Sequence, residues 1–292
     1  MKIRTLIVLL LIGLFAFNNI DAQKRFKKFF NKKGYKAGFF NGEDGHPFME
    51  FNYGVGEYKH KSFSSDFAKT GAAELKLGYR IIEDLDDNII SLQDNYLFFN
   101  DNTVDLKDKD ADGLKSELLS FGFGFRDAYG YRFGMVDVIP YSGASLSWNR
   151  LNMKDYPDTL LSPTGITDSK ILDRYNHSIR FGQKVEGGIS VSFNEFISVN
   201  AGYEATVIFP RYLTWKHLGN TAIELVGLGI VDEFVNEVAD ASPIAAPVVN
   251  FILKNAVTYG FYIWQRDKMN APFNTERPLT YETVKFGLTF TF

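Results

Sequence analysis

Strict alternation of apolar with small or polar residues recurs along this chain and constrains its fold more than any other feature. The stretch LSFGFGFR, residues 119–126, places Leu or Phe at every second position, with Ser, Gly and Arg between them. Because successive side chains of a β-strand point to opposite faces, such a stretch predicts a strand with one apolar face. Similar stretches predict eight strands, over residues 47–58, 71–81, 89–98, 115–127, 136–151, 176–193, 196–209 and 280–292.

The composition of the two strand faces favours a barrel over a soluble β-sandwich. One face carries mostly Phe, Leu, Val and Tyr, and the other carries Gly, Ser and Thr with spaced charges of both signs. The water-facing side of a sandwich should carry large polar side chains, whereas small residues fit the interior of a narrow barrel. Beyond residue 22 no run of eighteen apolar residues is free of charge, which argues against a helical membrane protein.

The intervals between the predicted strands alternate between long and short. They span 59–70, 82–88, 99–114, 128–135, 152–175, 194–195 and 210–279. An up-and-down membrane barrel has long outer loops and short inner turns, whereas a Greek-key sandwich gives no reason for such alternation. We therefore expect an all-β fold over residues 47–292, an eight-stranded antiparallel up-and-down transmembrane β-barrel.

Residues 1–22 have the layout of a secretory signal peptide. Lys2 and Arg4 precede an apolar run over residues 6–17, and the segment closes on small and polar residues. The sequence contains no Cys, which excludes disulfides and thiolate metal sites and suits an oxidising compartment. We expect cleavage of this segment and export of the remainder.

A basic segment follows, over residues 23–46. Its first part, 24–36, contains seven Lys or Arg residues, three Phe and no acid. This composition predicts either an amphipathic helix on the inner leaflet or a solvated basic tail, on the periplasmic side in both cases.

The last predicted strand keeps its apolar face to the final residue. That face consists of Phe286, Leu288, Phe290 and Phe292. The pattern resembles the C-terminal signal of bacterial outer-membrane barrels, which implies recognition by the barrel-assembly machinery. Over residues 47–292 the overall plan resembles the small eight-stranded barrels of the OmpA membrane-domain and OmpX type. That resemblance implies a place in outer-membrane lipid of a Gram-negative bacterium.

Predicted inward-facing charges indicate what the interior holds. They are five acids and six bases: Glu50, Glu74, Asp137, Glu186 and Glu204 with Lys76, Arg80, Arg126, Arg180, Lys184 and Lys285. An eight-stranded barrel is only wide enough for side chains, and buried charges must be paired. The near balance predicts a closed, salt-bridged lumen and a structural or partner-binding role. The alternative is a small porin or transport channel, which would need more strands or another register.

The strand over residues 89–98 fits this scheme poorly. If its apolar set faces lipid, Asp94 faces lipid too. The set comprises Ile90, Leu92, Tyr96 and Phe98. Either a bulge turns Asp94 inward, or the register of this strand is off by one residue.

Signals for enzymatic activity and for a nucleic-acid partner are weak. His60 and His177 lie near predicted outer strand ends, but no nucleophile, base and orienting group share a readable spacing. We therefore predict no catalytic residue, and a lipid-modifying outer-membrane enzyme is the weakest of the three alternatives. The net charge of −3 argues against nucleic acid as a partner.

One loop has the spacing of a calcium site. Asp108, Asp110 and Asp112 occupy alternate positions before Gly113, as in a calcium-binding loop. Leu119 stands where an EF-hand has its bidentate Glu. The loop is either a calcium site or a solvated acidic loop, and the sequence suggests no other cofactor.

The long interval 210–279 contains a helical pattern. Apolar residues recur at helical spacing over 223–238, and Lys254 is the single charge between 241 and 265. We expect a helical hairpin, 218–266, whose apolar surface packs on the barrel rim, enters the membrane or binds a protein partner. Alternation over residues 256–264 leaves a strand open as an alternative there.

Overall fold

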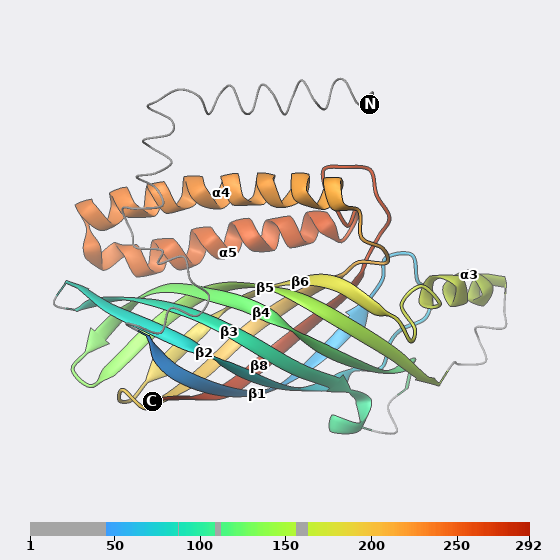
Figure 1. Ribbon diagram of the computed structural model, residues 1–292, viewed down its shortest axis with the longest axis horizontal. Coiled ribbons are helices and arrows are strands. Elements are labelled where there is room, and N and C mark those ends of the chain that lie inside the picture. Colours follow the sequence, from blue (N-terminus) through green and yellow to red (C-terminus); the bar gives the residue numbers. More distant parts are fainter. Residues whose placement is uncertain (1–44, 87, 109–111, 156–162) are drawn as a thin grey trace, which may run out of the picture. The chain divides into compact units, whose positions relative to one another are not determined.

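Eight antiparallel strands close into a barrel in which each strand pairs with the next along the chain and the last pairs with the first (Figure 1). The computed structural model describes residues 45–86, 88–108, 112–155 and 163–292, so the predicted signal peptide and almost all of the basic segment lie outside the described residues. The strands are β1 (His46–Lys59), β2 (Thr70–Asp86), β3 (Ile89–Thr103), β4 (Lys115–Phe133), β5 (Val136–Asp155), β6 (Ile179–Ser192), β7 (Ile197–Ile208) and β8 (Leu279–Thr291). The predicted fold class, strand number and up-and-down order are confirmed.

Closure between the first and last strands explains the apolar C-terminal pattern. In the β1–β8 ladder, Phe286 lies opposite Tyr53 and Leu288 lies opposite Phe51. Phe286 and Leu288 both point outward and are about half exposed or more. A strand edge cannot be left unpaired in lipid, so the last strand must be paired along its length and apolar on its outer face.

The predicted facing of β3 is wrong, and its register is shifted by one residue. Ile90, Leu92, Tyr96 and Phe98, predicted to face lipid, are buried in the barrel interior, whereas Leu97 and Phe99 are about half exposed on the outside. Asp94 therefore points inward without a bulge at that position, directly opposite Arg80 on β2 and Arg126 on β4. The cause is that apolar side chains of β3 fill the lumen on both sides of Asp94. Because Leu97 and Phe99 face outward, the strand has apolar residues on both faces.

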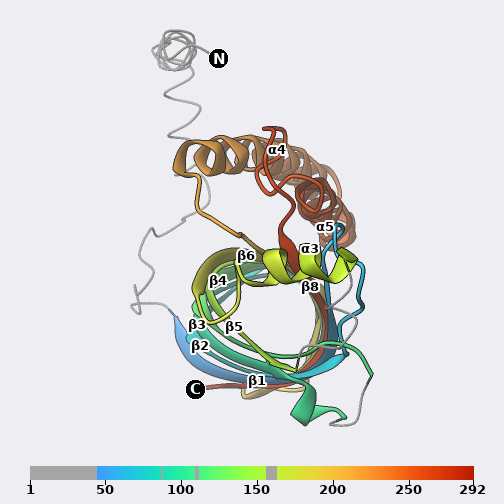
Figure 2. The ribbon, with the colours of Figure 1, turned by 90° about the vertical axis from the view of Figure 1, so that its right-hand side faces the viewer.

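Apolar clusters fill the barrel interior near both ends. At the end where β1, β3, β5 and β7 finish, called here the long-loop end, a large cluster includes Tyr58, Phe67, Leu114 and Tyr281. Helix α3 (Pro163–Leu172), which lies across this end in Figure 2, adds Leu172 to the cluster. At the opposite, short-turn end a second cluster consists of Ile90, Leu92, Ala128, Ile139 and Tyr141. A short 3-10 helix, η1 (Val104–Leu106), follows β3.

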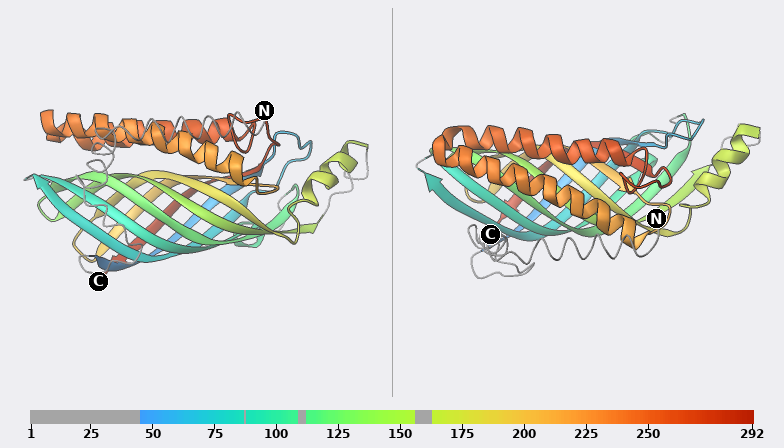
Figure 3. Two further views of the ribbon diagram at one scale, coloured as in Figure 1. Left: turned by 45° about the horizontal axis from the view of Figure 1, so that its top comes forward. Right: turned by 90° about the horizontal axis from the view of Figure 1, so that it is seen from above.

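The predicted helical hairpin is present as α4 (Thr214–Ala241) and α5 (Ala246–Gln265), with η3 (Pro243–Ala245) between them. Residues 256–264 are therefore helical, and the alternative of a strand there is wrong. The two helices run side by side along the outside of the barrel and not across its rim (Figures 1 and 3). α5 packs on β4, β5, β6 and β7. Neither helix combines the length and hydropathy of a helix that crosses a membrane, nor does any other described helix.

We expect a cation on the bare outer wall to destabilise the barrel far more than one in a turn. Leu97 lies near the middle of β3 and is half exposed, so Leu97→Lys should lower the free energy of unfolding by about 2–4 kcal/mol in lipid vesicles. Met135, in the turn after β4, is 80% exposed, and Met135→Lys should change it by less than about 0.5 kcal/mol. Urea titration in phospholipid vesicles measures both, and equal effects would contradict a lipid-facing wall.

Candidate functional site

The middle of the barrel interior holds a network of paired charges, called here the lumen network. It consists of five carboxylates and five cations: Glu50, Glu74, Asp94, Glu186 and Glu204 with Lys76, Arg80, Arg126, Lys184 and Lys285. Every one of these side chains is buried. They come from seven strands, all except β5, so the network crosses the lumen from wall to wall.

Arg126 joins three of the five carboxylates. Its Nη1 lies 2.9 Å from Glu50 Oε2 and 3.2 Å from Asp94 Oδ2, and its Nη2 donates to Glu50 Oε1 and Glu186 Oε1 at 3.0 and 3.1 Å. Asp94 in turn accepts two hydrogen bonds of 2.8 Å from Arg80 Nε and Nη2. Paired N–H···O bonds of this kind suit the planar guanidinium and fix its orientation.

The three lysines bind the remaining carboxylates. Lys76 Nζ lies 2.6 Å from Glu186 Oε2, and Lys285 Nζ lies 2.8 Å from Glu74 Oε1 and 2.6 Å from Glu204 Oε2. Lys184 Nζ lies 3.1 Å from Glu204 Oε1. Each lysine thus faces at least one carboxylate at hydrogen-bond distance.

Neutral groups add further hydrogen bonds to the charges. Asn52 donates to Glu50 and Glu74 at 2.8 and 2.9 Å, and Thr289 Oγ1 donates to Glu50 Oε2 at 2.9 Å. The Tyr141 hydroxyl donates to Glu186 Oε1 at 3.0 Å, and its ring lies 4.2 Å from the Arg126 guanidinium carbon. β5 thus takes part through Tyr141, although it contributes no charge to the network.

The structure brings together nine of the eleven charges predicted to lie inward. Asp137 and Arg180 are the exceptions, because each lies near an end of the barrel. Asp137 pairs with Arg132 near the short turn after β4, and Arg180 Nε donates to Ser178 Oγ at the start of β6. Asp94 was missing from the predicted set because the facing of β3 was assigned one residue off. Its position opposite two arginines in neighbouring strands was the signal that could have found it.

A set of polar contacts joins α5 to the outer wall of the barrel. Lys254 Nζ lies 2.8 Å from Asp232 Oδ1 of α4 and also pairs with Asp127, an outward-facing residue of β4. Gln183 of β6 donates to Gln265 at 2.7 Å, and the Tyr262 hydroxyl donates to Glu282 of β8 at 2.8 Å. We call this set of contacts the helix–wall seam.

Sequence reasoning missed the helix–wall seam, although two signals were present. Asp127, Gln183 and Glu282 occupy outward positions of strands whose other outward residues are largely apolar. Most polar residues of α5 share one helical face, since they recur at a spacing of three or four. These are Asn250, Lys254, Thr258, Tyr262 and Gln265. Polar positions on a lipid-facing wall together with a polar helical stripe indicate that the helix covers that wall.

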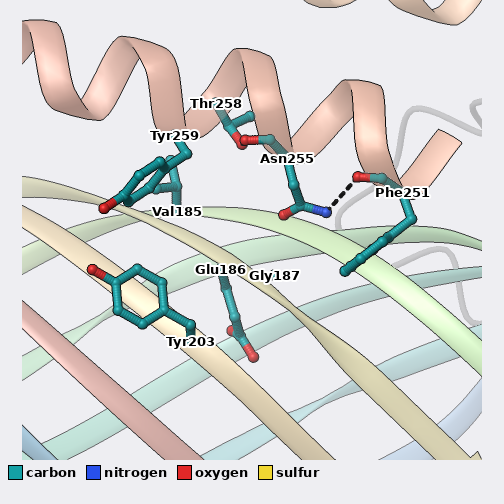
Figure 4. A pocket seen from close by; sticks show the side chains of 8 residues that line it. All are labelled: Val185, Glu186, Gly187, Tyr203, Phe251, Asn255, Thr258 and Tyr259. Atoms are coloured by element: carbon teal, nitrogen blue, oxygen red, sulfur yellow. Dashed lines mark hydrogen bonds between the residues drawn. The ribbon is translucent and has the colours of Figure 1, made fainter. Parts of the chain in front are cut away.

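A cavity of about 280 Å³ lies within the helix–wall interface (Figure 4). Its lining includes Gly187 and Tyr203 from the barrel and Phe251, Asn255 and Tyr259 from α5. A Cβ atom at Gly187 would come within 2.1 Å of Asn255 Oδ1, so glycine at this outward position lets α5 approach β6 closely. In Figure 4 Asn255 points from the helix toward the barrel wall, and Glu186 points away from it toward the lumen network.

The two histidines considered for catalysis lie in separate settings. His60 Nε2 lies 3.2 Å from the Arg277 carbonyl oxygen, and its Nδ1 accepts a hydrogen bond from the Ser62 backbone N–H. Burial lowers the pKa of His60. His177 has a positive φ of 55°, and its backbone N–H donates to the Leu151 carbonyl. Both ring nitrogens of His60 are thus engaged with loop backbone.

The predicted calcium loop falls partly outside the described residues, because Asp110 belongs to 109–111. Asp108 and Asp112 are exposed, and Gly113 has a φ of 107°, which favours glycine at this turn. Among the described residues, no group of three or more His, Asp or Glu side chains is placed to hold a metal ion. The calcium site stays a prediction.

The outer surface of the barrel is apolar where the helices leave it bare. Large side chains that are at least one-third exposed include Phe51, Tyr53, Leu77, Leu97, Phe99, Phe121, Phe125, Phe286 and Leu288. A closed antiparallel barrel of even strand number, polar inside and apolar outside, is the architecture of bacterial outer-membrane proteins. The fold of this chain is therefore that of the bacterial outer-membrane β-barrels.

Among the comparisons with known proteins, similar chains were found among solved structures alone. No protein-family model matches the chain, and no curated protein matches it. Neisserial surface protein A (NspA) is 14% identical over 84% of this chain and 97% of its own, with a TM-score of 0.37. Ail, the attachment invasion locus protein of Yersinia pestis, is 7% identical over 85% of this chain and 99% of its own, with a TM-score of 0.33. The fold assignment therefore rests on the strand pairing of this chain.

Removal of Arg126 should strongly destabilise the barrel. Arg126→Ala leaves Glu50, Asp94 and Glu186 with fewer cations in a buried site, so the free energy of unfolding should fall by about 3–5 kcal/mol. Arg132→Ala is the matched control on the same strand, because Arg132 pairs at a partly exposed position and should cost no more than about 1 kcal/mol. Urea unfolding compares the two variants, and similar losses would contradict a stabilising lumen network.

Loss of Lys254 should weaken the docking of the hairpin. Lys254→Ala leaves Asp127 and Asp232 without their shared cation, which should cost about 1–3 kcal/mol. Lys61→Ala removes an exposed pair with Asp267 and should cost less than about 1 kcal/mol. Near-UV circular dichroism during urea unfolding reports both, and an unchanged Lys254→Ala variant would show that the Lys254 ion pairs do not hold the hairpin.

Proposed function

We propose that this chain is a non-enzymatic outer-membrane barrel with a closed lumen, whose role is structural or partner-binding and not transport. The observation that carries this proposal is the lumen network. Its ten charged side chains are buried and are paired with one another across the barrel. Ions that cross such an interior would have to displace these pairs, which are fixed by hydrogen bonds from several strands.

The apolar clusters at the two ends support the same role. The long-loop end is filled by the cluster that contains Tyr58, Phe67 and Tyr281, and α3 contributes Leu172 to it. At the short-turn end the cluster that contains Ile90, Leu92 and Ile139 comes from β3, β4 and β5 and occupies one side of the lumen. A conducting pathway would therefore have to pass the apolar layer at the long-loop end in addition to the charged one.

Two other functions were considered from the sequence, and the geometry favours neither. A small porin requires a continuous polar passage, which the lumen network and the apolar cluster at the long-loop end oppose. A lipid-modifying enzyme would need a nucleophile, a base and an orienting group in mutual contact. His60, one of the two histidines near the outer strand ends, instead binds the Arg277 carbonyl and the Ser62 N–H, which supports a structural role for it.

Recognition by the barrel-assembly machinery belongs to this proposal as well. Phe286, Leu288 and Phe292 are exposed on the outward face of the chain's last residues, and Phe290 is partly exposed there. An apolar outward face is compatible with recognition of β8 before the barrel closes, when its edge toward β1 is still free.

We expect the purified protein to give no steady conductance in a planar lipid bilayer. A variant with Glu50, Lys76, Arg126 and Glu186 all replaced by Ala removes two charges of each sign from the middle of the lumen, and should leak if it folds. The matched control replaces the Arg132 and Asp137 pair near the short turns and should stay closed.

Heat-modifiable gel mobility establishes that each variant is folded before its conductance is measured. Steady conductance by the unaltered protein would overturn the closed lumen and favour the channel. A folded quadruple variant that remains closed would show that the end clusters, and not the lumen network, seal the barrel.

A further inference from the structure

The polarity of α5 is inverted relative to a helix on the surface of a water-soluble protein. Its buried face, which contacts the barrel and α4, contains Asn250, Lys254, Thr258 and Gln265. Its exposed face carries no charge and consists mainly of large apolar side chains, namely Val248, Ile252, Ile263 and Trp264. In water the opposite arrangement is expected, with the apolar stripe covered.

α4 has the same inversion over its first two-thirds. Exposed side chains there include Leu218, Ile223, Leu225, Val226 and Ile230, of which Ile230 is 67% exposed. Glu224 is the one acid in this part of the helix and is only partly exposed. It lies four residues after the buried Asn220 and seven before the buried Val231, a spacing that places it on the inner face of α4.

Charges limit this apolar surface. On α4 the exposed acids are Glu233, Glu237 and Asp240. Asp232 lies 2.8 Å from Lys254, so Glu233 lies beside the middle of α5, and the uncharged apolar stretch on the outward face of α4 runs from Leu218 to Ile230. At the long-loop end α5 is followed directly by the charged residues 266–268. The outward face of α5, from Val248 to Trp264, extends about 24 Å at 1.5 Å per residue, and the apolar stretch of α4 extends about 18 Å. The longer of the two is close to the apolar band of about 25 Å on membrane barrels.

We propose that the outward face of the α4–α5 hairpin lies in the hydrocarbon of the membrane and is covered by lipid acyl chains. The inference rests on the proposed membrane location of the barrel and extends it to the helices. The hairpin runs along the outside of the same barrel whose bare wall exposes Phe51, Leu97 and Phe121 (Figure 3). The exposed surface of the hairpin is apolar like that wall, apart from the acids Glu233, Glu237 and Asp240 in the last part of α4.

The modest overall hydropathy of the helices agrees with this arrangement. A helix that crosses a membrane alone must be apolar on every side, because lipid surrounds it. Here lipid would meet one face only, and the helix–wall seam satisfies the polar groups of the other face through Asp127, Gln183 and Glu282. The hairpin thereby shields polar positions of the barrel wall and becomes part of the lipid-facing perimeter.

Site-directed spin labelling tests this proposal directly, because the chain contains no Cys and each label is therefore unique. Nitroxides at Ile223→Cys, Val226→Cys and Ile263→Cys would be compared in phospholipid vesicles for relaxation by oxygen, which concentrates in hydrocarbon, and by a water-soluble nickel chelate. We expect oxygen-to-nickel accessibility ratios equal to that of Leu97→Cys on the bare wall. They should be several-fold above those of Met135→Cys and of Glu237→Cys, the matched control on α4.

Three outcomes would overturn the inference, and they are distinguishable. Nickel-accessible hairpin labels with an oxygen-accessible Leu97→Cys would place the hairpin in water while leaving the membrane barrel intact. Nickel accessibility at Leu97→Cys as well would overturn the membrane location itself. Hairpin labels that neither reagent reaches would indicate a protein or a second copy of this chain on residues 218–266. Heat-modifiable mobility of each labelled variant shows that it is folded.

Discussion

Attraction between opposite charges in a lumen too narrow for bulk water is the interaction on which this barrel depends. A carboxylate in such a place is tolerated only when a cation or hydrogen-bond donors take the place of its hydration shell. Arg80, Asp94 and Arg126 lie opposite one another on three adjacent strands, so their pairing holds in one register only. A slip of one residue would carry these charges to the outer face. The lumen network therefore specifies strand register while it fills the interior.

On the outer surface of the barrel, too, polar side chains have partners within the protein. Most outward positions are apolar, but Asp127, Gln183 and Glu282 are not, and each finds its partner on α5. Gly187 gives α5 room to approach the wall, because any larger side chain there would meet Asn255. The barrel and hairpin sequences are thus complementary, and neither surface of the seam would suit lipid alone.

The sequence was sufficient for the strands, their number and the closure of the barrel, because alternation with period two identifies strands that have one apolar face. It was insufficient for β3, where Ile90 and Leu92 fill the lumen while Leu97 and Phe99 face outward, so that apolar residues occur on both faces. Nine charges of the lumen network followed from alternation, and Asp94 was lost with the register of β3. The hairpin was predictable as helices, but periodicity reports a stripe and not whether protein or lipid covers it.

The residues that accompany the stripe favour lipid as its cover. On α5 the side that packs on protein is the polar one, and Lys254 reaches both Asp127 and Asp232 from it. Rotation of the helix by half a turn would place Val248 and Ile252 on the barrel but would expose Lys254, Thr258 and Gln265 and leave Asp127 without its cation. In water such a rotation would hide apolar surface and hydrate the charges, so the observed orientation would be unfavourable there. The observed orientation is favourable only where the surroundings of the hairpin are less polar than the protein wall behind it, as they are in a bilayer.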